Sequence, residues 1–139
     1  MTTSIFVNLP VSDLEASKAF YTALGYSINP NFTDETAACV VFSDTIYTML
    51  LTHDKFSQFT DQPIADTRNS AGAIVAISAD SREGVDVLAT KAVEAGGSET
   101  YDPRDLGFMY SRAFRDLDGH HWEVVYMDQA AAQSGPPEH

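Results

Sequence analysis

The sequence repeats one pattern in its two halves, and this internal repeat restricts the fold more than any other feature. In each half a short segment of alternating apolar residues precedes a helical segment, and further apolar segments separated by turn residues follow. The helical segments end alike, in the sequences ALGY and EAGG, at Gly25 and at Gly96-Gly97. Glycine commonly ends a helix because it adopts the left-handed backbone conformation without steric cost. We therefore predict two copies of one βαβββ unit, in a single α+β domain of 139 residues.

Both predicted helices have a polar start and one apolar face. Ser12 with Glu15, and Asp80 with Glu83, have the spacing of a capping box, in which the first side chain accepts a hydrogen bond from a free backbone N–H. Apolar residues at helical spacing then follow, namely Ala16, Ala19, Phe20, Ala23 and Leu24 in the first helix and Val85, Leu88, Ala89, Ala92 and Val93 in the second. We expect each helix to pack through this face against its own sheet.

The strands are predicted from alternation and from the turn residues between them. After the helices they lie near residues 27–32, 37–43 and 45–52 in the first half, and near 98–102, 108–115 and 121–127 in the second. In the opening strands we assign Val7 and Leu9, and likewise Val75 and Ile77, to the face that packs on the helix. Because successive side chains of a strand point to opposite faces, Phe6, Asn8 and Ile74 then point away from the helix.

The predicted domain has four parts. The first module covers about residues 4–52 and the second about 72–128. Residues 53–71 form a linker with a short helical turn near 55–59, and residues 129–139 form a polar tail that we expect to be flexible.

The charge balance argues against a nucleic-acid partner. The chain has 8 basic and 20 acidic residues, a net charge of −12, and no cluster of basic residues. A nucleic-acid-binding protein needs clustered Lys and Arg to displace counterions from phosphates. The acidic surface either serves solubility or attracts a cationic ligand.

The remaining composition predicts a soluble cytoplasmic protein. No apolar run approaches the roughly 20 residues that a membrane helix needs, and the first residues, MTTSIFVNLP, lack the pattern of a secretory signal. Cys39 is the only cysteine, which excludes an internal disulfide and a cysteine zinc site and fits a reducing compartment. Because Cys39 lies in the apolar run AACVVF, we interpret it as a packed strand residue rather than a nucleophile.

Two segments carry a family resemblance that covers residues 4–128. The segment NLPVSDLEASKAFYTALGY resembles the opening of a vicinal oxygen chelate module, and DLDGHHWEVVYM resembles its closing hairpin. This superfamily includes glyoxalases, bleomycin-resistance proteins and extradiol dioxygenases. The resemblance implies two modules whose sheets curl into one open cup, often with the binding cavity completed in a homodimer. We therefore predict a homodimer of about twice 15.2 kDa.

The resemblance also implies where a metal ion would be bound. In the metal enzymes of the superfamily, His or Glu at four inward-facing strand positions holds a divalent ion, which acts as a Lewis acid. These positions align here with Phe6, Thr48, Ile74 and Glu123, with Thr48 placed by matching Tyr47 to Trp122. Only Glu123 is a good ligand, so we predict no cofactor. A divalent metal at Glu123 is the alternative.

Other polar residues near these positions are further candidates. His121 lies two residues before Glu123 and shares its face, and with Asn8 the two suggest a displaced site or a proton-transferring pair. Alternatively, His121 is a strand-end residue in solvent and His120 belongs to the turn. Arg112 lies in an apolar strand and either pairs with Glu123 or a ligand anion, or lies at a solvated edge. Trp122, Tyr126 and Phe114 are expected in the core.

Two functions remain open on the sequence. The first is a metal-free small-molecule-binding protein of the glyoxalase/bleomycin-resistance type. The second is a metal-dependent lyase, isomerase, thiol transferase or dioxygenase that uses a displaced site around His121 and Glu123. The predicted ligand-binding residues are Phe6, Asn8, Thr48, Ile74, Arg112, His121 and Glu123.

Overall fold

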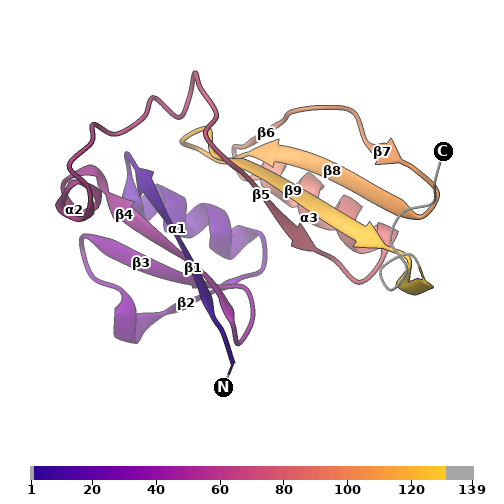
Figure 1. Ribbon diagram of the computed structural model, residues 1–139, viewed down its shortest axis with the longest axis horizontal. Helices are drawn as coiled ribbons and strands as arrows, with labels where there is room; N and C mark the ends of the chain where they lie inside the picture. Colours follow the sequence, from indigo (N-terminus) through magenta and orange to yellow (C-terminus); the bar gives the residue numbers. More distant parts are fainter. Residues whose placement is uncertain (1, 131–139) are drawn as a thin grey trace. The chain divides into compact units, whose positions relative to one another are not determined.

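The computed structural model describes residues 2–130 of the chain. The chain divides into two compact units, residues 1–70 and 71–139. In each unit one long helix crosses one face of an open sheet, as Figure 1 shows for α1 and α3.

The first unit contains a four-stranded sheet in the order β1-β4-β3-β2. Its elements are β1 (Ile5–Val11), α1 (Leu14–Ala23), β2 (Ser27–Asn29), the 3-10 helix η1 (Pro30–Phe32), β3 (Ala37–Val41), β4 (Ile46–Thr52), α2 (His53–Phe56) and the 3-10 helix η2 (Ser57–Phe59). The opening strand β1 pairs in parallel with the last strand β4, and the other pairs are antiparallel. The predicted helical turn of the linker corresponds to α2 and η2.

The second unit has the same strand order, β5-β9-β8-β6. Its elements are β5 (Ile74–Ser78), α3 (Arg82–Glu94), β6 (Ser98–Glu99), β7 (Arg104–Asp105), β8 (Met109–Arg115) and β9 (His121–Met127). Again the opening strand β5 is parallel to the last strand β9, so the predicted βαβββ repeat and α+β fold are confirmed.

The edge of the second sheet differs from the sequence prediction. The strand expected at 98–102 is shortened to the two-residue strand β6, and a further two-residue strand that was not predicted, β7, follows it; both pair with β8. Pro103 lies between them, and proline has no N–H to donate to a strand ladder. The chain leaves the ladder there, which frees Tyr101 to contact other residues.

Both long helices begin one residue later than predicted. The N-cap residues are Asp13 and Ser81 rather than Ser12 and Asp80, and they accept hydrogen bonds from the N–H of Ala16 (3.1 Å) and of Gly84 (2.9 Å). Each start contains two adjacent residues that are good caps, and the second of the two is the one used. The helix ends agree with the prediction, because Gly25 and Gly96 have φ of 107° and 111°.

The buried core of each unit lies between the helix and the sheet. In the first unit its largest members are Phe20 and Tyr21, and in the second they are Phe114 and Trp122, whose rings stack at 6.5 Å. The predicted apolar faces of the helices are partly wrong. In α1, Ala19 and Ala23 are exposed, because the inward positions are Leu14, Ser17, Phe20, Tyr21 and Leu24. In α3, Val93 is exposed. Tyr126 is only half-buried. Over residues 2–130, no helix is both long and apolar enough to cross a membrane.

Candidate functional site

The two faces of the first sheet differ in what covers them. Thr48 and Leu50 of β4 are fully buried, at 1% and 0% exposure, and we assign them to the face of the sheet on which α1 packs. Met49, which lies between them in sequence, points to the other face, and α1 does not cover that face (Figure 1). On this open face lies a hollow of about 360 Å³, lined by Phe6, Asn29, Phe32, Cys39, Tyr47 and Met49.

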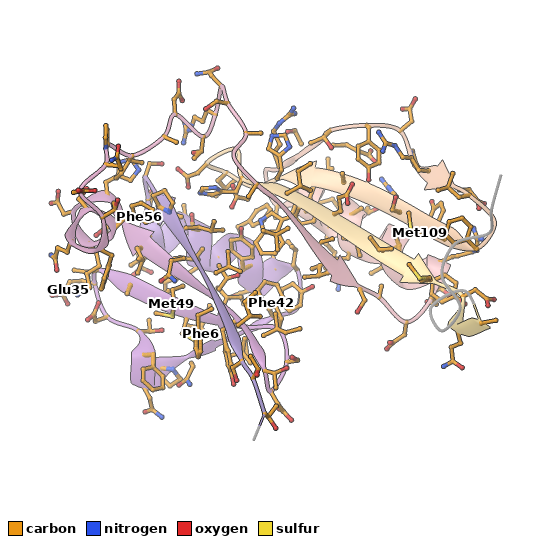
Figure 2. All side chains as sticks on the ribbon, in the orientation of Figure 1. Phe6, Glu35, Phe42, Met49, Phe56 and Met109 are labelled. Carbon is orange, nitrogen blue, oxygen red and sulfur yellow. The ribbon has the colours of Figure 1, made fainter. Side chains whose placement is uncertain are left out.

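Two rows of side chains cross the open face, because the strand register brings their members side by side. One row contains Phe6, Tyr47 and Val41, and the other contains Asn8, Met49, Cys39 and Asn29. Figure 2 shows Phe6 and Met49 on the same face of the sheet. The hollow is therefore built mostly by long-range pairing of β1, β2, β3 and β4 rather than by one sequence motif.

Aromatic side chains form one wall of the hollow. The rings of Phe6 and Tyr47 are stacked, with centroids 4.8 Å apart and planes inclined by 10°. The hydroxyl of Tyr47 donates to the carbonyl of Asp44 at 2.7 Å, and this hydrogen bond fixes the orientation of the Tyr47 ring. Phe6 is 54% exposed, so much of its surface is accessible to solvent. Phe32, at the end of η1, is exposed on the rim of the same hollow.

The sulfur side chains and one amide complete the hollow. Cys39 is buried, and burial raises the pKa of its thiol, which therefore stays neutral at physiological pH. Asn29 Oδ1 accepts a hydrogen bond from the N–H of Asn31 at 3.0 Å. This bond leaves Nδ2 of Asn29 as a donor without a partner in the described part of the chain. None of the six lining residues carries a formal charge at neutral pH.

Thr33 holds the rim of the hollow to the sheet. Its hydroxyl donates to the carbonyl of Asn29 at 2.7 Å and accepts a hydrogen bond from the N–H of Cys39 at 3.1 Å. The 3-10 helix η1 is thereby attached to β3, and Phe32 is kept at the hollow.

The open face of the second sheet is polar where that of the first is apolar. Glu123 of β9 accepts a 2.8 Å hydrogen bond from the hydroxyl of Tyr101, which also lies 3.3 Å from the hydroxyl of Ser111. Burial, above all, raises the pKa of Tyr101, so its hydroxyl remains a donor at neutral pH. The guanidinium carbon of Arg104 lies 3.8 Å from the centre of the Tyr101 ring. Tyr101 was not among the residues predicted from the sequence, although Pro103, two residues later, is a signal for the end of a strand.

Arg112 does not lie on this open face, so its predicted pairing with Glu123 is wrong, and it does not lie at a solvated edge, because β8 has strand neighbours on both sides. Val124 is its register partner across β8 and β9, whereas Ala113 is the partner of Glu123, so Arg112 and Glu123 point to opposite faces. The Arg112 side chain is 15% exposed and bonds Glu99 through Nε at 2.8 Å and Asp86 through Nη1 at 3.3 Å. The hydrogen bond to Glu99, first among several causes, raises the pKa of Arg112. Its role is to join α3 and the strand edge to the sheet.

Thr48 is also misplaced by the sequence alignment. The register pairs are Asn8 with Met49 in the first unit and Ala76 with Glu123 in the second, so Met49 rather than Thr48 is the counterpart of Glu123. Burial agrees, since Thr48 and Trp122 are each 1% exposed. The match of Tyr47 to Trp122 was wrong by one residue, and one residue changes the face.

The residues at the four positions that the resemblance assigns to a metal ion are not a conventional ligand set. With Met49 in place of Thr48, the four aligned positions hold Phe6, Met49, Ile74 and Glu123, and only Glu123 offers charged oxygen donors. Ile74 is 62% exposed on its own sheet. Within residues 2–130 no group of three or more His, Cys, Asp and Glu side chains is arranged to hold a metal ion.

The other two predicted residues make local contacts only. Asn8 is exposed, and its Nδ2 donates to the carbonyl of Phe6 at 3.2 Å. His121 is half-buried, and Nε of Arg115 lies 3.4 Å from its Nε2. Both residues lie on open faces, Asn8 in the first unit and His121 in the second, as the strand alternation predicted.

Comparison with known proteins identifies the family. A family model described as bleomycin resistance protein-like N-terminal matches residues 3–43. A hypothetical protein from S. aureus is 30% identical, with 91% of this chain and 95% of that chain covered and a TM-score of 0.76. A glyoxalase/bleomycin resistance protein/dioxygenase family enzyme from Burkholderia phytofirmans is 16% identical, with 91% and 99% covered and a TM-score of 0.74. The chain belongs to the glyoxalase/bleomycin-resistance/dioxygenase family.

A further relative agrees with this assignment. A glyoxylase/bleomycin resistance protein/dioxygenase domain from Frankia is 25% identical, with 91% of this chain and 98% of that chain covered and a TM-score of 0.66. No curated protein matches the sequence. The resemblance to the vicinal oxygen chelate superfamily is thus confirmed, together with the fold. Because one fold hosts binding proteins and several classes of enzyme in this family, the function must be argued from the site.

Proposed function

We propose that this member of the glyoxalase/bleomycin-resistance/dioxygenase family binds a small organic molecule on the open face of its first sheet, without a metal ion. The hollow between β1 and η1 carries the proposal. Its volume of about 360 Å³ is in the range of small-molecule sites, which measure roughly 300–1,000 Å³. Such sites are mostly apolar with few polar groups, and here five of the six lining residues present rings or sulfur atoms.

The metal-free part of the proposal rests on ligand chemistry. A hard divalent cation prefers several oxygen ligands, and one carboxylate would leave it weakly bound and mostly hydrated. Cys39 and Met49 are soft donors, but the thiolate is the form that binds metal, and burial raises the pKa of the Cys39 thiol. Both arguments support binding by shape and stacking rather than by coordination.

We also propose that two copies of the chain associate. The edge strands β1 and β5 expose the apolar side chains Ile5 and Ile74, and apolar sheet edges are usually covered. Sedimentation at micromolar concentration is expected to give about twice 15.2 kDa. The net charge of −12 and the single cysteine support a cytoplasmic protein that binds no nucleic acid.

The direct test uses the neutral fluorescent dye Nile red and protein purified without chelator. Elemental analysis measures bound metal, and dye fluorescence is compared before and after EDTA. We expect saturable binding that EDTA does not change and that Phe6→Ala weakens. Phe59→Ala is the matched control, because Phe59 is exposed but does not line the hollow. Absence of dye binding, or its loss with EDTA, would refute the proposal.

A second candidate function is favoured by one observation on the second unit. Glu123 is half-buried, is oriented by Tyr101, and is not paired with a basic side chain anywhere in residues 2–130. A metal-dependent lyase, isomerase, thiol transferase or dioxygenase with a displaced site around His121 and Glu123 would use this carboxylate. Titration with Zn²⁺ and Mn²⁺ by calorimetry distinguishes the two functions. Stoichiometric binding that Glu123→Gln abolishes would favour the enzyme.

A further inference from the structure

We infer that the hollow selects a neutral, flat aromatic molecule with one hydrogen-bond acceptor, of the class of aryl ketones. This inference rests on the proposed function and names the ligand class for that same site. Three features of the hollow support it: its stacked wall, its lack of charge and its single oriented donor.

The stacked wall determines the shape of the ligand. Phe6 and Tyr47 present parallel rings, inclined by only 10°, and Phe6 is more than half exposed. A flat ring system placed on Phe6 would continue this stack, which is a favourable arrangement for aromatic pairs. The row from Asn29 through Cys39 to Met49 crosses two strand spacings, about 10 Å in all. A fused system of two or three rings matches this span.

The absence of charge determines the polarity of the ligand. A charged ligand would lose its hydration in this hollow and would find no ion-pair partner among the lining residues. The net charge of −12 is therefore not a guide to this ligand, although it suggested a cationic one in the sequence analysis. Cys39 forms the buried floor of the hollow, and because burial raises the pKa of its thiol, this floor also remains uncharged at neutral pH.

The amide of Asn29 supplies the one directional contact. The bond from the N–H of Asn31 occupies Oδ1 and so determines which end of the amide is the donor. Asn29 lines the hollow, and its Nδ2 is the strongest unoccupied donor among the lining side chains, since the Tyr47 hydroxyl already donates to Asp44 and a thiol is a weak donor. A carbonyl oxygen on the ligand would satisfy it.

The experiment compares three tricyclic probes of similar size. 9-Fluorenone has the carbonyl acceptor, fluorene has the same shape without it, and 3,6-diaminoacridinium is a flat cation. Affinities are measured by calorimetry in moderate salt, and the cation is assayed by its ability to displace fluorenone. We expect fluorenone to bind at least fivefold more tightly than fluorene, and the cation to displace it poorly.

The variant Asn29→Asp isolates the donor. A carboxylate at this position still accepts the bond from Asn31 N–H, so the cap of η1 is retained while the donor is lost. Since the added charge would weaken both neutral probes, the readout is the ratio of their affinities, which should fall from at least five to about one. Phe59→Ala should keep the original ratio. Circular dichroism confirms that each variant is folded.

The outcomes separate this inference from the proposed function. Equal affinity for fluorenone and fluorene in the natural protein overturns the inference even if Asn29→Asp does not fold. Retention of the preference in folded Asn29→Asp, or efficient displacement by the cation, also overturns it. If none of the three probes binds while Nile red binds in a Phe6-dependent way, the ligand class is wrong and the proposed function stands. If Nile red also fails to bind, the proposed function fails.

Discussion

Replacing Arg112 by alanine tests whether this side chain belongs to the scaffold or to a ligand site. The guanidinium joins Glu99 and Asp86, so its removal leaves two carboxylates of α3 and the sheet edge without their cation. A hydrogen bond between charged groups contributes about 1.5–3 kcal/mol when it is buried, whereas an exposed ion pair contributes about 0–1 kcal/mol. Arg112 is 15% exposed, but Glu99 and Asp86 are 33% and 50% exposed.

The expected loss lies between these limits. Water can replace the guanidinium on both carboxylates, and the hydroxyl of Tyr110 keeps its 2.6 Å bond to Asp86. We therefore expect Arg112→Ala to lower the free energy of unfolding by about 1–2 kcal/mol. Arg112→Lys should lose less, because a single ammonium retains the charge but not the two directed contacts.

The assay is urea unfolding followed by the fluorescence of Trp122. This residue is the only tryptophan and lies in the core of the second unit, so it reports on the unit that contains Arg112. Arg82→Ala is the control, since the side chains of Arg82 and its partner Asp105 are 42% and 56% exposed and their pair should matter less. An unchanged urea midpoint for Arg112→Ala, together with weaker binding of Nile red, would refute the scaffold role and restore a ligand contact.

Three further predictions follow from burial and backbone geometry. Burial raises the pKa of Tyr26 to about 12 from 10.0, so between these two pH values the phenol ionises in the unfolded chain but not in the native protein. The native state should therefore lose stability as the pH rises from 10.0 to about 12, and urea titrations at high pH should show that Tyr26→Phe removes this loss. Gly96→Ala should lower the free energy of unfolding by more than about 1 kcal/mol, because φ is +111° and the added Cβ would lie 3.0 Å from Leu117. Gly25→Ala should cost less, because nothing lies within 4 Å of its added Cβ. Equal urea midpoints for the two variants would contradict this prediction. Cys39 should react with iodoacetamide far more slowly in the native protein than in urea, and rapid native labelling by mass spectrometry would show that the floor of the hollow is open.

The sequence was sufficient for the topology because the decisive signals are local. Helix stops at Gly25 and Gly96, and alternation in the opening strands, are encoded within a few residues. The faces of the opening strands were also predictable, since alternation alone places Phe6 opposite the helix. The helix starts were wrong by one residue because Ser12 and Asp13 are both competent caps.

The site could be predicted only where it depends on one strand. Asn29, Cys39 and Met49 form a row through pairing between strands, and no sequence spacing reveals a row of this kind. The alignment of Thr48 relied on matching Tyr47 to Trp122 by residue type, whereas the register places Tyr47 with His121. Tyr101 contacts Glu123 because the edge strand is interrupted between β6 and β7. Pro103 predicts that a strand ends there, but it does not predict which residue the Tyr101 side chain contacts.

The matching registers of the two sheets allow their open faces to be compared position by position. At equivalent places on the open faces, one copy now carries tyrosine, methionine and cysteine (Tyr47, Met49, Cys39), and the other carries histidine, glutamate and alanine (His121, Glu123, Ala113). Since each unit has its own buried core, we expect a substitution on one open face to leave the stability of the other unit unchanged. The repeat thus presents the same backbone twice, with an apolar open face in one unit and a charged open face in the other.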